Sequence, residues 1–252
     1  MTTNPKPNRS SGPVVGRPVA GRRPVAGRLV VALDGPSSSG KSTVGAEAAR
    51  RLHYRFCDTG LLYRAVSWLA LERGLAPADV DALVPLASEV ELVADARGRL
   101  RYVEAGGRDV THEVRGAAVD RAVSDYSKVP QLRAVLVTRQ RDLAGTGRII
   151  MAGRDIGTVI LPDADVKIYL SASAEERARR RAVQRGTVDE SEADQILDEL
   201  RRRDSIDSSR ETAPLRAASD AVIIHTDGNS FEQTVGAVVA AIHAAEGEAR
   251  VR

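Results

Sequence analysis

Short apolar runs alternate with longer segments of helical periodicity along most of the chain. The apolar runs are rich in valine and isoleucine, have the length of strands buried on both faces, and lie at Leu29–Leu33, Tyr54–Asp58, Arg148–Gly153, Asp165–Leu170 and Asp220–His225. Apolar residues at helical spacing predict helices over 41–52, 59–73, 79–88, 112–124, 130–143 and 231–242. Strands that alternate with helices in this way indicate an α/β fold with a doubly wound, five-stranded parallel sheet.

One stretch near the middle of the chain breaks this alternation. Val90–Ala94 and Arg99–Glu104 alternate apolar and polar residues with a period of two, and Asp95–Gly98 between them reads as a turn. Arg108–Val110 follows a pair of glycines and predicts a third short strand. We therefore expect residues 84–120 to form a small inserted antiparallel subdomain.

Two highly charged segments predict a pair of helices that are poor in apolar residues. Ser173 stands at the N-cap position of the first, residues 174–185, and the second covers residues 190–208. A weak apolar face gives such helices little to hold them in place, so we expect residues 174–210 to form a helical lid. Most arginines of this segment are expected on solvated faces, paired about one turn away with acidic residues such as Glu175, Glu176, Asp198 and Glu199. The arginines concerned are Arg179, Arg180, Arg181, Arg185, Arg201, Arg202, Arg203 and Arg210.

A phosphate-binding motif follows the first predicted strand. Gly35 to Ser42 match G-x-x-x-x-G-K-[S/T], in which the two glycines permit backbone conformations that turn successive amides inward onto an anion. Lys41 is placed to reach the β- and γ-phosphates, and the Ser42 hydroxyl is placed to ligate Mg²⁺. The motif predicts a P-loop NTPase-type fold and an ATP-binding loop formed by Gly35, Pro36, Ser37, Ser38, Ser39, Gly40, Lys41, Ser42 and Thr43.

Composition limits the class of protein. The chain has 252 residues and a net charge of +3, but residues 1–28 alone carry +6 and no acid, so the remainder carries about −3. Residues 1–28, rich in Pro, Gly and Arg, are expected to be a disordered basic tail, and residues 29–252 the folded domain. Since the basic charge lies in the tail, no specific nucleic-acid partner is expected, beyond weak binding of polyanions by the tail.

The cellular setting is predicted from the same composition. No apolar run is long enough for a membrane span, and no secretory signal is recognisable. The single cysteine, Cys57, rules out an internal disulfide and is expected to be buried. We expect a cytoplasmic, monomeric protein.

Polar residues gather where the predicted parallel strands end. The phosphate loop, Asp58, Arg154 and Asp155 all follow strands, so they should meet in the crevice outside the carboxyl ends of the sheet. A small-molecule kinase needs cations around an acceptor phosphate, polar groups for the acceptor and a lid that excludes water. The sequence offers all three.

Four segments together resemble those of bacterial cytidylate kinases. They are Asp34-Gly-Pro-Ser-Ser-Ser-Gly-Lys-Ser-Thr43, Asp58-Thr-Gly-Leu-Leu-Tyr-Arg64, Gly153-Arg-Asp-Ile-Gly-Thr158 and Arg203-Asp-Ser-Ile-Asp-Ser-Ser-Arg210. The phosphate loop alone is shared by many families, whereas the last two segments are more specific. The resemblance runs from about Leu29 to the end of the chain and includes the inserted stretch.

The resemblance implies transfer of the γ-phosphate of ATP, with Mg²⁺, to CMP or dCMP, giving CDP or dCDP and ADP. Residues at positions matching the family then acquire roles. Those implied to hold the cytosine are Thr59, Arg133, Asp155 and Arg210. Those implied to hold the sugar are Ser124, Arg203 and Asp207, and those for the acceptor phosphate are Arg64 and Arg154. Lys41, Arg154 and Arg203 are the implied catalytic cations.

Other functions remain open from the residues alone. One is another small-molecule kinase, acting on shikimate, gluconate or a different nucleotide. Another is a nucleotide-dependent switch or assembly ATPase, although the Asn-Lys-x-Asp segment of guanine-reading switches is absent from the sequence. A third is a nucleic-acid-binding module that uses the basic tail.

Overall fold

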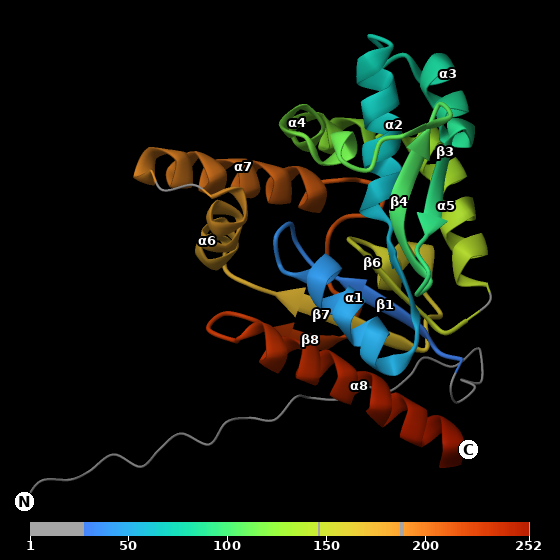
Figure 1. Cartoon of the computed structure of the whole chain (residues 1–252), viewed down its shortest axis with the longest axis vertical. Helices are drawn as coiled ribbons and strands as arrows, with labels where there is room; N and C mark the ends of the chain where they lie inside the picture. The colour runs from blue at the N-terminus through green and yellow to red at the C-terminus, as the bar shows by residue number, and fades with distance from the viewer. Residues whose placement is uncertain (1–27, 146, 187–188, 252) are drawn as a thin grey trace, which may run out of the picture.

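The computed structural model describes residues 28–145, 147–186 and 189–251, so the predicted tail lies outside the described residues except for Arg28. One sheet forms the centre of the described chain (Figure 1). Its parallel strands are β2 (Arg55–Asp58), β6 (Ile149–Gly153), β1 (Val30–Asp34), β7 (Val166–Ser171) and β8 (Val222–His225), in that spatial order. These are the five strands predicted from the apolar runs, and their parallel pairing is confirmed.

Strand β1 lies in the middle of these five parallel strands and is buried on both faces. Val30 and Ala32 belong to one hydrophobic cluster, and Val31 and Leu33 to another. The second cluster includes helices α1 (Lys41–Leu52) and α8 (Phe231–Val251). The first includes α2 (Gly60–Glu72), α4 (Ala117–Tyr126) and α5 (Pro130–Ala144). Because neighbouring side chains of a strand point to opposite faces, an unbroken apolar run is what such a position requires.

The inserted stretch, residues 84–120, joins the main sheet, whereas a separate subdomain was predicted. Strands β3 (Val90–Ala94), β4 (Arg99–Ala105) and β5 (Arg108–Asp109) pair antiparallel with one another as expected. However, β4 also pairs in parallel with β2, with Phe56 opposite Arg99 and Cys57 opposite Leu100. The described sheet therefore has eight strands, and the predicted five-stranded sheet with a separate small sheet was wrong on this point. Alternation shows which face of a strand is buried but does not reveal its neighbour.

Two predicted helices are each divided. The segment predicted as a helix over 79–88 forms α3 (Val80–Leu83) and then the 3₁₀ helix η1 (Val84–Glu89). Pro85 lacks the amide that an α-helix would need there. The segment over 112–124 forms the 3₁₀ helix η2 (Glu113–Arg115) and then α4, because Gly116 is extended, with ψ 158°.

The two charged helices stand together beside the carboxyl edge of the sheet. They are α6 (Ala174–Arg185) and α7 (Glu190–Ser208), and they project from the sheet next to α4 (Figure 1). Ala178, Ile196 and Leu200 form a small hydrophobic cluster of their own between them. The Ser173 hydroxyl accepts a hydrogen bond from the Glu176 amide at 3.2 Å, which confirms the predicted N-cap.

The structure also bears on the predictions for Cys57 and for a membrane span. Cys57 is fully buried in β2, and burial raises the pKa of its thiol well above the ordinary value. No helix among residues 28–145, 147–186 and 189–251 is long and apolar enough to cross a membrane.

Candidate active site

The phosphate loop connects β1 to α1 at the carboxyl end of the sheet, as predicted. Gly35 has φ 153°, and a Cβ there would lie 2.4 Å from the Leu170 carbonyl oxygen. Gly40, at the N-cap of α1, has φ 93°. Both glycines are therefore required by the path of the backbone. The loop leads into the positive end of α1, which favours an anion.

Lys41 is folded against this loop. Its ammonium donates to the Pro36 carbonyl at 2.6 Å and to the Ser39 hydroxyl at 3.4 Å. Burial, together with the charge of Arg154, lowers the pKa of Lys41 well below its ordinary value. Negatively charged phosphate oxygens bound in the loop would favour the protonated, charged form of Lys41 and raise its pKa again.

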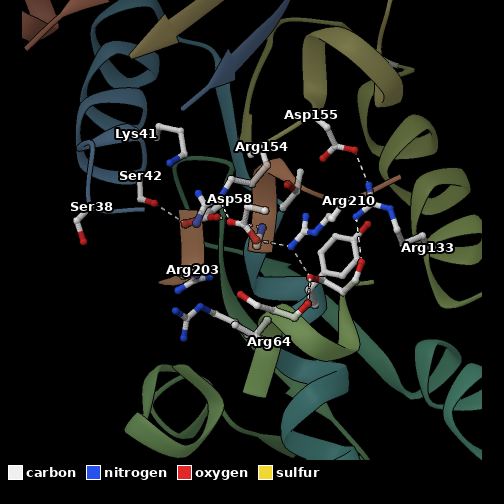
Figure 2. A pocket seen from close by; sticks show the side chains of 18 residues that line it. Ser38, Lys41, Ser42, Asp58, Arg64, Arg133, Arg154, Asp155, Arg203 and Arg210 are labelled. Atoms are coloured by element: carbon white, nitrogen blue, oxygen red, sulfur yellow. Dashed lines mark hydrogen bonds and ion pairs between the residues drawn. The ribbon is translucent and has the colours of Figure 1, made fainter. Parts of the chain in front are cut away.

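A serine and a carboxylate meet beside Lys41. The Ser42 hydroxyl donates to Asp58 Oδ2 at 2.6 Å, joining the start of α1 to the end of β2 (Figure 2). Hydroxyl and carboxylate oxygens are the ligand type that Mg²⁺ prefers. Within the described ranges, no three His, Cys, Asp or Glu side chains come together as a metal-binding group. A bound Mg²⁺ would thus complete its coordination with nucleotide phosphates and water.

A cavity of about 150 Å³ begins at these residues and extends between α2, α4 and β6. Figure 2 shows Lys41, Ser42 and Asp58 at one side of it, and Arg133, Asp155 and Arg210 at the other. All nine residues implied to hold the acceptor nucleotide line this cavity: Thr59, Arg64, Ser124, Arg133, Arg154, Asp155, Arg203, Asp207 and Arg210. The structure thus brings the predicted set together from four separate stretches of sequence.

The far side of the cavity is built on a buried ion pair. Arg133 and Asp155 are 4% and 5% exposed, and a guanidinium nitrogen of Arg133 donates to Asp155 Oδ2. The Arg133 guanidinium also lies over the Tyr63 ring, 5.4 Å from its centroid. Burial raises the pKa of Asp155, although the charge of Arg133 opposes this. Oδ1 of Asp155 remains as the acceptor for a ligand.

Asp207 holds two further arginines in place. It is 1% exposed, and its two carboxylate oxygens accept from Arg154 Nε, at 2.7 Å, and from Arg210. Arg210 also donates to the Ser127 hydroxyl at 2.7 Å. Burial opposes ionisation of Asp207, but the charges of Arg154 and Arg210 together lower its pKa below the ordinary value.

Thr59 and Ser124 lie on the cavity wall with different partners. Thr59 is at the N-cap position of α2, but its hydroxyl donates to the Ala152 carbonyl at 2.9 Å and makes no cap hydrogen bond. The hydroxyl therefore ties α2 to β6. Ser124 is buried on α4, one turn before Ser127.

Arg64 and Arg203 approach the cavity from α2 and α7 (Figure 2). Arg64 donates to Asp120 and, at 2.9 Å, to the Val114 carbonyl. Arg203 lies 3.8 Å from Asp120, and its buried Nε has no hydrogen-bond partner among the described residues. A buried donor without a partner is costly, so an acceptor from a ligand would stabilise this arrangement.

The lid arginines divide into two groups. Arg179 pairs with Glu176, and Arg201 pairs with Glu175 across to α6, which agrees with solvated, paired positions. Arg180 also pairs with Glu176 but is partly buried and donates to the Thr226 carbonyl at 2.6 Å. Arg181 instead reaches from α6 to Asp120 on α4. Arg181 therefore departs from the solvated pairing expected of most lid arginines, because α4 packs near enough to offer a carboxylate.

Sequence reasoning placed Asp58 in the crevice without giving it a role, and it did not identify Ser127 or Asp120. Spacing carried a usable signal for two of them. Asp120 lies four residues before Ser124 on α4, so helical geometry puts both on one face, and Ser127 lies one turn further on. Asp58 ends a parallel strand next to the phosphate loop, where polar groups converge.

The chain was compared with known proteins. The family model for cytidylate kinase matches residues 31–244. A cytidylate kinase from Mycobacterium avium (strain 104) is 47% identical over 211 residues, covering 82% of this chain and 92% of the relative. One from Geobacillus thermodenitrificans (strain NG80-2) is 46% identical over 217 residues, covering 84% and 95%.

A solved structure of shikimate kinase from Acinetobacter baumannii, in complex with shikimate, covers 86% of this chain and 94% of its own at 14% identity, with a TM-score of 0.43. That likeness is too low to support a conclusion. The family model and the relatives span nearly all of the chain that holds the site. The chain belongs to the cytidylate kinase family.

Proposed function

We propose that this chain transfers the γ-phosphate of ATP to CMP or dCMP, giving ADP and CDP or dCDP. The observation that carries the proposal is one cavity that joins a phosphate loop to the buried Arg133–Asp155 pair. The relatives described above are cytidylate kinases, which supports the same substrate.

Cytosine has the donor and acceptor pattern that this pair complements. Its N4 amino group donates, and its N3 and O2 atoms accept. Asp155 Oδ1 accepts from N4, while Arg133 and Arg210 donate to N3 and O2. Uracil would set an oxygen against Asp155, and a mismatched buried polar group costs about 1–3 kcal/mol. Thr59, whose hydroxyl oxygen can still accept a hydrogen bond, lines the same cavity.

The sugar and the acceptor phosphate lie between the base and the phosphate loop. Ser124, Arg203 and Asp207 serve the sugar, and Arg64 and Arg154 bind the acceptor phosphate. Arg154 is fixed by Asp207 on one side and by the Gly35 carbonyl at 3.2 Å on the other. This arrangement holds its guanidinium between donor and acceptor before either nucleotide arrives.

The donor phosphates lie in the loop from Gly35 to Thr43. Ser42 and Asp58 would hold Mg²⁺, which would supply neutralisation of the charge on the phosphates. Lys41 turns from the Pro36 carbonyl to these oxygens.

The transfer itself needs little proton chemistry. A phosphate oxygen of CMP, already anionic at neutral pH, attacks the γ-phosphorus, and the bond from that phosphorus to the bridging oxygen of ADP breaks. Lys41, Arg154 and Arg203 stabilise the charge that spreads over the transferring group. The protein lowers the barrier to transfer by aligning the two nucleotides and by holding positive charge in place before they react.

Residues 174–210 act as the lid and 84–120 as the nucleoside monophosphate-binding insert within the domain that spans 29–252. The lid packs on its own small cluster of Ala178, Ile196 and Leu200, and polar contacts link it to the rest of the site. Closure over both nucleotides would keep water from intercepting the γ-phosphate.

A coupled ADP-release assay tests the proposal with ATP and Mg²⁺ against CMP, dCMP, UMP, AMP, GMP and shikimate. Turnover well above the others is expected for CMP and dCMP. Turnover on shikimate, or on no acceptor at all, would refute the proposed acceptor.

A further inference from the structure

Asp120 forms ion pairs with arginines from three other helices. Its carboxylate, on α4, accepts from Arg64 on α2 and from Arg181 on α6. Arg185 on α6 and Arg203 on α7 each lie 3.8 Å from it. Neither Asp120 nor Arg181 has a role in the proposed reaction.

Arg185 also pairs with Glu199, at 3.3 Å, which leaves Asp120 facing the three guanidinium groups of Arg64, Arg181 and Arg203. One carboxylate cannot balance three of them. Burial opposes ionisation of Asp120, but the charges of Arg64, Arg181 and Arg203 together hold its pKa below the ordinary value. Burial, with the charges of Arg154 and Arg64, lowers the pKa of Arg203 to about 9. Excess positive charge therefore remains around Asp120 and favours a second anion.

The position of Asp120 identifies that anion. Asp120, Arg64 and Arg181 line a cavity of about 710 Å³ that is also lined by Lys41 and Ser42 of the phosphate loop. A polyphosphate bound in this loop would thus face Arg64 and Arg181, which now contact the carboxylate. Arg203 lines the adjoining cavity of about 150 Å³, which Lys41 and Ser42 also line. Two anions that share one set of arginines compete for them.

We propose that Asp120 is an internal substitute for phosphate: it binds Arg64, Arg181 and Arg203 in the nucleotide-free enzyme and gives them up to nucleotide phosphates on binding. While the site is empty, the carboxylate links the lid to α2 and α4 and prevents the arginines from repelling one another. When the phosphates bind, they take over this link. The inference rests on the proposed function, since it assumes that phosphates enter this cavity.

Asp120→Asn tests the proposal, because asparagine keeps the shape and removes the charge. The matched control is Asp125→Asn on the same helix, where the carboxylate is exposed and pairs with Lys128 at 3.2 Å. Titration calorimetry with tripolyphosphate, without nucleotide, measures competition directly. Asp120→Asn should bind it at least about fivefold more tightly than wild type, since couplings of this kind span roughly 5–150-fold. Asp125→Asn should match wild type.

Hydrogen exchange of lid peptides measures the second half of the proposal. Asp120→Asn should exchange faster than wild type over 189–208 in the free enzyme. The difference should disappear with CMP and a non-hydrolysable ATP analogue bound. Faster exchange in both states would show a fixed structural pair and overturn the proposal.

Arg181→Gln provides a variant with the opposite expected sign. It also frees the lid in the empty enzyme, but it should weaken tripolyphosphate binding because it removes a cation. If Asp120→Asn weakens binding as well, Asp120 organises the arginines without competing, and the proposal fails. A failure of CMP to bind would refute the proposed function while leaving the tripolyphosphate result intact.

Discussion

Replacing Asp155 by asparagine is expected to change which base the enzyme accepts. Asp155 and Arg133 are both almost fully buried, and Arg133 occupies Oδ2. The asparagine oxygen should stay with Arg133, because the guanidinium only donates. The amide NH₂ is then left where Oδ1 was, and a donor replaces an acceptor at the base.

The size of the effect follows from that single reversal. Against cytosine the NH₂ faces the N4 amino group, which costs at least about 1 kcal/mol. Against uracil the NH₂ can donate to the O4 oxygen. The mismatch between the Asp155 carboxylate and uracil, which costs a similar free energy in the wild type, is thereby removed. The CMP to UMP ratio of kcat/KM should therefore fall by at least about 2 kcal/mol, or roughly 30-fold.

The ratio is its own control for loss of stability. Asp155→Asn also leaves the charge of Arg133 uncompensated, so the variant should be less stable. Unfolded protein lowers turnover on both nucleotides equally and cancels in the ratio. Asp155→Asn with wild-type preference for CMP would refute this account of base recognition.

Three further substitutions test other parts of the site. Lys41→Ala should lower kcat by about 10²–10³-fold with an unchanged circular dichroism spectrum, since a preorganised cation is lost; near-normal turnover would remove Lys41 from the mechanism. Asp207→Asn should lower the free energy of unfolding by about 3 kcal/mol at pH 7, as a buried carboxylate between Arg154 and Arg210 is lost. Because the pKa of Asp207 is depressed in the folded protein, its stabilisation is present above the unfolded pKa of about 3.9 and is lost as the pH falls through the folded value. Urea unfolding should therefore show a weaker loss of stability in acid for the variant, and equal slopes would contradict this. Thr59→Val should raise KM for CMP by about three- to tenfold, the equivalent of one hydrogen bond, and leave KM for ATP unchanged; an unchanged KM for CMP would limit Thr59 to its bond with the Ala152 carbonyl.

The parallel strands and the phosphate loop were predictable because each depends on local sequence. The run from Leu29 to Leu33 must be apolar to sit between two hydrophobic clusters. The glycines of the loop are required by the backbone at their own positions. Predictions from the sequence agree with the structure where the burial or backbone conformation of a residue is determined at its own position.

The pairing of β4 with β2 was not predictable from the same patterns. Only two residue pairs make that join, and neither Arg99 nor Leu100 carries a signal for its partner strand. The division of the 112–124 segment at Gly116 was missed for a related reason, since helical spacing on both sides hides a break between them.

The site residues were predictable as a set but their partners were not. Resemblance placed Arg64 and Arg203 at an acceptor nucleotide, and the structure brings both to one cavity. It could not indicate that Asp120 holds them, because a carboxylate on α4 and arginines on α2 and α7 meet only in three dimensions. The charge balance of the site depends on such contacts.

The central claim is that the γ-phosphate passes directly to a cytidine monophosphate. Incubation with γ-³²P-labelled ATP, Mg²⁺ and CMP, followed by chromatography of the products, tests it most directly. The label should appear in CDP at the same rate as ADP forms, and equimolar UMP should take up little. Label recovered as inorganic phosphate while CMP stays unchanged would contradict the account.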